Sequence, residues 1–180
     1  MAWNSGSFNN TVFSFLSNIE SKPLSSISEV IGNAYNSAST TAMISTFPAT
    51  PINLKGPGVI QSGFSQSFSD AFGEDEFQIT PPIWTSAANS IISYWTGVTF
   101  SLVPPPGGAA GITNILINPG DINILINGIA AAFSSGNPGD AASILTDTCI
   151  SHLATITGTW SGSTASVPPV PFVFPWVGLS

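Results

Sequence analysis

The tetrapeptide Asn-Pro-Gly-Asp occurs twice in this chain, at 118–121 and at 137–140. Asparagine is a preferred N-cap residue, proline is favoured at the first helical position, and an aspartate in the first turn lies at the positive end of the helix dipole. Apolar residues follow each copy at helical spacing. Each copy therefore predicts a helix start, with Asn118 and Asn137 as the caps. An acidic metal loop is not expected, because one aspartate per copy supplies too few oxygen ligands.

Earlier parts of the chain show the same helical signature, with apolar residues recurring every three or four positions. Two helix-start signals support it. Ser26 and Glu29 form a capping box before an apolar run, and Thr80 precedes two prolines that fit a first turn. The chain is therefore expected to be mainly α, a small domain of about five helices that hold roughly half of the residues. The earlier helical segments cover residues 7–19, 26–42, 60–72 and 80–95.

The pattern changes after residue 153, where threonine becomes frequent and apolar and polar residues alternate. This alternation predicts a short β segment, with a hairpin turn at Ser161–Gly162. The last stretch, 167–180, holds four prolines, which exclude a helix or a central strand. The expected organisation is a helical domain over 1–160, with a Pro/Gly-rich internal linker at 103–111, and an extended Pro-rich arm over 161–180.

The C-terminal arm carries several large apolar side chains, which would form a patch of the kind that monomers avoid. Its prolines restrict the backbone in advance, so ordering the arm costs less entropy than ordering a flexible tail. We expect the arm to dock as a clamp in a groove of a neighbouring subunit or partner. Folding back over the chain's own core is the alternative. The predicted interface residues are Val170, Phe172, Phe174, Trp176, Val177 and Leu179.

Charged residues make up only 6% of the chain, against about 25% in an average soluble domain. Arginine is absent, and the two lysines are Lys22 and Lys55. A surface built from Ser, Thr, Asn, Gly and Pro suits contact with copies or partners, because few charges have to be desolvated on assembly. The net charge of −7 argues against nucleic acid and anionic membrane surfaces as partners, since both are bound through Lys and Arg.

No targeting or membrane-spanning segment is expected. The first ten residues, MAWNSGSFNN, lack the basic region and the apolar core of a signal peptide. A transmembrane helix needs about 20 apolar residues in a row. The most apolar stretch, 112–133, is interrupted by Pro119, Gly120 and Asp121 and therefore does not qualify.

Residues with catalytic or metal-binding chemistry are scarce. A hydrolase that uses His152, the only histidine, with Asp147 or Asp140 remains an alternative, but the chain has no G-x-S-x-G elbow. Cys149, the only cysteine, cannot form an internal disulfide, gives an incomplete zinc site with His152, and is expected to be buried. The acidic run at 73–77, GEDEF, lacks the ligand spacing of a calcium loop. We therefore expect no enzyme activity, no metal or cofactor and no small-molecule substrate.

Three stretches carry a resemblance to a known class of protein: NPGDINILINGIAAAF at 118–133, ISHLATITGTW at 150–160 and VPPVPFVFPWVGLS at 167–180. In these the chain resembles small virion structural proteins of tailed bacteriophages, including those of marine and cyanobacterial phages. The resemblance implies a non-enzymatic subunit of a tail, baseplate or capsid, located in the virion, with copies of itself and other virion structural proteins as partners. An exposed decoration or surface-adhesion module is the alternative.

Overall fold

The computed structural model describes residues 2–19, 22–45, 49–73, 80–101, 110–164 and 166–180. Within these ranges the chain is mainly helical, with a small antiparallel sheet that includes its C-terminal part, as the sequence predicts. The helices are α1 (Ser5–Leu16), α2 (Leu24–Ser39), α3 (Pro57–Phe72), the 3-10 helix η2 (Pro81–Trp84), α4 (Thr85–Trp95), α5 (Ile122–Ser134) and α6 (Pro138–Leu153). The strands are β1 (Ala110–Asn118), β2 (Thr157–Ser163) and β3 (Pro171–Val177).

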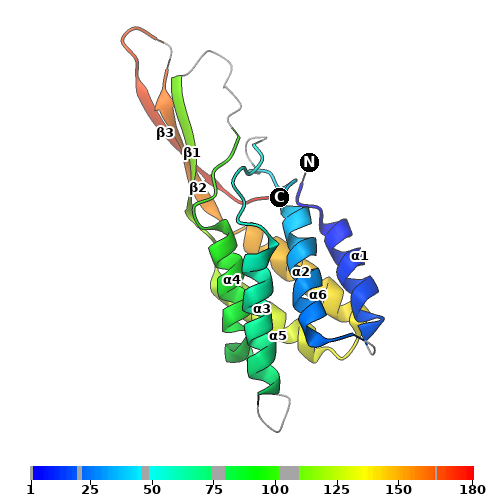
Figure 1. The fold of residues 1–180 in the computed structure, drawn as a ribbon. Coiled ribbons are helices and arrows are strands. Elements are labelled where there is room, and N and C mark those ends of the chain that lie inside the picture. The colour runs from blue at the N-terminus through cyan, green and yellow to red at the C-terminus, as the bar shows by residue number, and fades with distance from the viewer. Residues whose placement is uncertain (1, 20–21, 46–48, 74–79, 102–109, 165) are drawn as a thin grey trace.

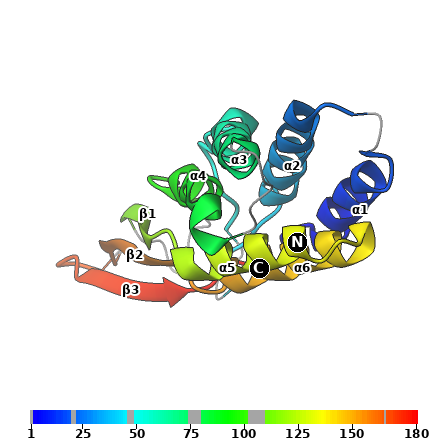
Figure 2. The ribbon, with the colours of Figure 1, turned by 90° about the horizontal axis from the view of Figure 1, so that it is seen from below.

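The six α-helices of the described residues form a closed ring, which we call the helical ring. Each helix packs against the next along the chain, and α6 packs against α1. Figures 1 and 2 show α1 to α4 as a curved row, with α5 and α6 lying across its other side. The apolar positions that repeat at helical spacing point into the ring, as Phe8, Val12 and Leu16 do in α1. The periodicity in the sequence therefore marks the faces that form the core.

Neighbouring helices come close together at glycines. A Cβ atom added at Gly63 of α3 would meet the side chain of Ser90 on α4 and would lie 2.6 Å from the carbonyl oxygen of Ser86. In α5, a Cβ atom at Gly128 would collide with the side chain of Thr148 on α6. Such short helix–helix distances leave no room for even one methyl group. Glycine at these positions is therefore required by packing.

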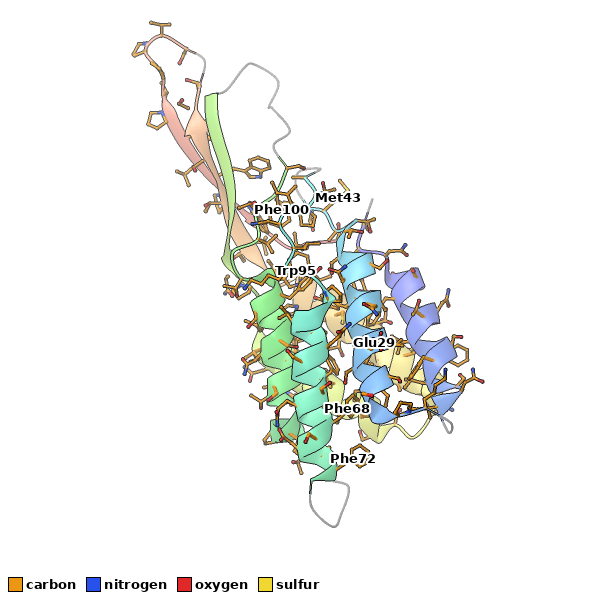
Figure 3. The ribbon with its side chains drawn as sticks, in the orientation of Figure 1. Glu29, Met43, Phe68, Phe72, Trp95 and Phe100 are labelled. Atoms are coloured by element: carbon orange, nitrogen blue, oxygen red, sulfur yellow. The ribbon has the colours of Figure 1, made fainter. Side chains whose placement is uncertain are left out.

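Aromatic side chains fill two regions of the ring. At the end next to the sheet, the Trp95 indole N–H donates a hydrogen bond to the Tyr35 hydroxyl at 2.7 Å, which joins α4 to α2. At the other end, Trp84 stacks on Phe133, and Phe68 meets both rings edge-on. Figure 3 shows Phe68 in the body of the ring and Trp95 near its upper end. Edge-on and stacked contacts of this kind add to the stabilisation from apolar burial.

The structure confirms one of the two predicted asparagine caps. The Asn137 side chain accepts the N–H groups of Gly139 at 2.8 Å and Asp140 at 3.2 Å and so caps α6. The prediction for Asn118 is wrong, because that residue ends β1. Its side chain accepts the Gly120 N–H instead, and α5 is capped by Asp121, which accepts the Asn123 N–H at 2.9 Å. Pairing of β1 with β2 extends through Asn118, so the helix cannot begin there.

The other two start signals do not act as predicted. Helix α2 begins at Leu24, before Ser26, and its N-cap residue Pro23 makes no side-chain capping bond. The capping box of Ser26 and Glu29 is therefore inside the helix. Thr80 does precede η2, but its side chain makes no capping bond either. In both places a proline, with its restricted backbone, marks the boundary where a side-chain cap was expected.

The sheet has the strand order β1-β2-β3, with antiparallel pairing throughout, and it projects from one end of the helical ring (Figure 1). The predicted hairpin turn at Ser161–Gly162 is wrong, because β2 runs straight through it. The chain turns at 164–170 instead, where the Thr164 N–H donates to the Val170 carbonyl at 2.9 Å. Strand β1 was not predicted. Of the predicted linker at 103–111, the part up to 109 lies outside the described residues, and Ala110 and Gly111 begin β1.

Candidate assembly interface

Strand β3 lies at an edge of the sheet, and its two prolines face that edge. The Gly178 N–H donates to the Ile156 carbonyl at 2.8 Å, so the even-numbered residues of this segment direct their backbone groups toward β2. The N–H and C=O groups of successive residues point to opposite sides of a strand. The odd-numbered residues, including Pro171 and Pro175, therefore direct their backbone groups to the free edge. Proline has no N–H to donate there. The free edge of β3 therefore offers fewer donors to a further strand, and the expectation that this segment is no central strand is confirmed.

Two of the six predicted interface residues, Trp176 and Leu179, lie in the chain's own core. Trp176 is 1% exposed and meets Phe100 edge-on, with ring centroids 5.3 Å apart. Leu179 is 4% exposed, and its N–H donates to the Leu153 carbonyl at 2.9 Å. Figure 3 shows Phe100 where the helical ring meets the base of the sheet. The end of the arm thus folds back on its own chain, which is the arrangement of the alternative expectation.

The remaining predicted interface residues lie on the surface of the sheet or at its far turn. Val170, Phe174 and Val177 are more than half exposed, and Phe172 is partly buried with its ring 5.4 Å from that of Phe174. Sequence reasoning missed Val173, which is 65% exposed. The period-2 alternation of a strand would have found it, but the prolines argued for an irregular arm. A role of these residues in assembly remains a prediction.

Paired residues of β2 and β3 divide the sheet into two faces. Residues directly opposite each other in an antiparallel pair place their side chains on the same face. On one face, which we call the open face, every residue is exposed or partly exposed, and none is buried under the helical ring. On the other face, Trp160 and Trp176 are buried. The open face consists of the pairs Thr157–Val177, Thr159–Pro175, Ser161–Val173 and Ser163–Pro171.

The sheet contains no charged side chain. All Asp, Glu, Lys and Arg residues lie between 20 and 76 or between 121 and 147, and so outside the three strands. The whole stretch 148–180 has His152 as its one ionisable side chain apart from the buried Cys149. A projecting surface with exposed valines and phenylalanine and without charge is unusual for a monomer.

His152 is fully buried against the first Asn-Pro-Gly-Asp turn. A Cβ atom at Gly120 would lie 2.5 Å from its Nε2 atom, so the imidazole fills the space under that glycine. Neither ring nitrogen makes a hydrogen bond of good geometry. Burial lowers the pKa of His152 to about 4, although the Pro119 carbonyl and the Asp121 carboxylate favour the charged form. The imidazole is therefore neutral near pH 7 and inaccessible.

The residues proposed as partners of His152 are not brought to it. Asp140 and Asp147 are both exposed on α6, whereas His152 is buried. Cys149 is buried, as expected, and burial raises the pKa of its thiol. Within the described residues, no group of three or more His, Cys, Asp and Glu side chains is placed to hold a metal ion. Of the acidic run at 73–77, the part from Glu74 onward lies outside the described residues.

In the part of the chain that the structure describes, no helix combines the length and the apolar character needed to cross a membrane. Comparison with protein-family models, with curated proteins and with solved structures finds no match for this chain.

Proposed function

We propose that this chain is a non-enzymatic structural subunit of a viral particle, in its tail, baseplate or capsid, and that it acts through packing between subunits. The charge-free sheet supports this proposal most directly. It projects from the helical ring and exposes valine, proline and phenylalanine side chains to solvent. Such a surface can be covered by another protein without desolvating an ion, which makes burial on assembly inexpensive.

The helical ring suits the role of a rigid base for that sheet. Its helices approach closely at Gly63 and Gly128, and the C-terminal residues anchor the sheet to the ring. Main-chain hydrogen bonds join Met43 and Ser180 in both directions, at 2.8 and 2.9 Å. A fixed angle between ring and sheet helps a subunit that must be repeated in register. The viral setting itself rests on the resemblance of the three stretches described above.

The direct test is the composition of particles. We expect mass spectrometry of particles purified from the source of this sequence to find the chain in a constant ratio to the other particle proteins. Particles that lack it, or that contain it in variable traces, would contradict the proposal. The expected partners are copies of the chain and other particle proteins, and not nucleic acid, a membrane or a small molecule.

A decoration or surface-adhesion module is the second candidate, because a projecting sheet can also serve as a recognition face. Solution behaviour separates the two. A module of this kind should be a stable monomer, whereas an assembly subunit should associate as its concentration rises. The hydrolase alternative has no support in the geometry around His152. Hydrolysis of an ester or peptide substrate that is lost in His152→Gln, with the fold intact, would revive it.

A further inference from the structure

We propose that a second copy of this chain packs on the open face, so that two sheets lie face to face about a two-fold axis. This inference rests on the proposed function and narrows it to one surface and one partner. Three observations carry it: the shape of the open face, the prolines at the β3 edge and the distribution of charge. The size of the surface sets the strength of the contact.

The shape of the open face fits packing against another sheet. Its side chains stand in four direct cross-strand pairs, each joining a Ser or Thr of β2 to a Val or Pro of β3. These side chains are short, so the part of the face that β2 and β3 form has no bulky projection. Two such faces can approach to about 10 Å, the usual spacing of packed sheets. The opposite face is less suitable, because its base is occupied by the contact of Trp176 with Phe100.

The edge of β3 is unsuited to the other common way of joining sheets, which is to add a strand. Pro171 and Pro175 remove two of the four outward donors of this strand. Edge prolines are a known protection against strand addition. Contact through a face does not need backbone donors, so the prolines leave it possible. On the open face these same prolines instead contribute apolar surface.

Charge favours a second copy as the occupant. The chain carries a net charge of −7, so two copies repel each other wherever their carboxylates approach. The open face has no ionisable side chain, and contact there brings no carboxylates together. A nucleic acid or an anionic lipid surface would find no cation on it, and a basic partner would find no carboxylate. The same uncharged face on another copy matches it, and a two-fold axis lets one surface serve both partners.

The size of the open face predicts a weak contact. Seven-residue strands span about 23 Å at 3.3 Å per residue, and the two strands that form the open face are about 9 Å wide. The footprint is therefore roughly 200 Å², well below the ~800 Å² per partner of a standard interface. A single pair of copies should dissociate on dilution. In a repeated assembly, many such contacts act together and become stable.

Sedimentation velocity over a wide concentration range tests the inference with three proteins. We expect the wild type to shift from monomer toward dimer as concentration rises. The double variant Val173→Asp/Val177→Asp should dimerise at least about tenfold more weakly, because carboxylates would then face each other. Phe174→Asp, on the opposite face, should behave as the wild type. All three substituted residues are exposed, and circular dichroism will confirm folding. If the double variant unfolds, Val173→Thr/Val177→Thr serves in its place.

Cross-linking tests the geometry separately. Thr159 lies near the middle of the open face, so Thr159→Cys should form covalent dimers when oxidised with copper–phenanthroline. The native Cys149 is buried and does not compete. Ser65→Cys, on an exposed position of α3, is the matched control and should cross-link no more than the wild type.

The outcomes separate this inference from the proposed function. If association is lost in Phe174→Asp but kept in the double valine variant, the open face is not the contact surface. The proposed role in assembly would be unaffected by that result. Equal cross-linking at positions 159 and 65 would also overturn it. A wild type that stays monomeric at every concentration would refute the dimer, while the composition of purified particles would still decide the proposed function.

Discussion

Replacing Gly63 by alanine is expected to force α3 and α4 apart. The new Cβ atom would lie 2.6 Å from the Ser86 carbonyl oxygen, whereas ordinary contacts begin near 3.4 Å. Neither a backbone carbonyl nor the Ser90 Cβ atom can turn away, so the helices must separate by at least about 0.8 Å at this point, the difference between these two distances. The variant therefore tests the close approach of α3 and α4.

The cost follows from the groups beside the glycine. The Ala87 N–H, in the first turn of α4, donates to the Ser67 hydroxyl of α3 at 3.0 Å, and both residues are buried. Separation would strain this bond, which is worth about 1 kcal/mol. Overpacking adds about 1–3 kcal/mol, and the higher helix propensity of alanine returns about 1 kcal/mol. The expected net loss is about 2 kcal/mol in the free energy of unfolding, or roughly 4–8 °C in the melting temperature.

Gly58 provides the control within the same helix. A Cβ atom there would meet nothing within 4 Å. Gly58→Ala should therefore keep the stability of the wild type or raise it by up to about 1 kcal/mol. Urea unfolding, followed by circular dichroism, measures both variants. If Gly63→Ala proves as stable as Gly58→Ala, the two helices do not meet at this position, and the packing of the ring is not as described.

Three further outcomes are expected. Asn137→Ala should lower the free energy of unfolding by about 1 kcal/mol. Asn118→Ala should lower it less, because Asn118 caps no helix. Equal losses of stability in urea unfolding would contradict the assignment of Asn137 as the only cap of the two. Trp176→Ala should lower the free energy of unfolding by about 3–5 kcal/mol. Phe174 is exposed, so Phe174→Ala should change this free energy by less than about 0.5 kcal/mol. A Trp176→Ala variant as stable as the wild type would show that the arm does not complete the core. Stability should also depend on pH through His152, whose folded pKa of about 4 lies below its ordinary 6.5. The unfolded chain therefore binds the proton first, so this contribution is complete above pH 6.5 and falls by about 3 kcal/mol toward pH 4. His152→Gln should lack this slope in urea titrations, and a slope that persists would assign it to other groups.

Much of the helical part could be predicted from the chain alone, because helix formation depends on neighbours three and four residues away. The spacing of Phe8, Val12 and Leu16 marks the buried face of α1 without reference to any other helix. The Asn137 cap is equally local, since its partners are two and three residues further on. The edge position of β3 also follows from sequence, because proline cannot donate to a ladder.

Tertiary structure decided the features that depend on distant partners. Strand β1 exists through its pairing with β2, about 40 to 50 residues later, and this pairing moved the N-cap of α5 from Asn118 to Asp121. The Ser67 hydroxyl reaches an N–H of α4 from another helix, which no local pattern encodes. The Pro-rich arm has the composition of a free clamp, yet Trp176 and Leu179 fit the core at the junction of ring and sheet. Burial in the chain's own core removes these two side chains from water as effectively as burial in a neighbouring subunit would. Only the shape of the folded ring decides which of these two arrangements forms.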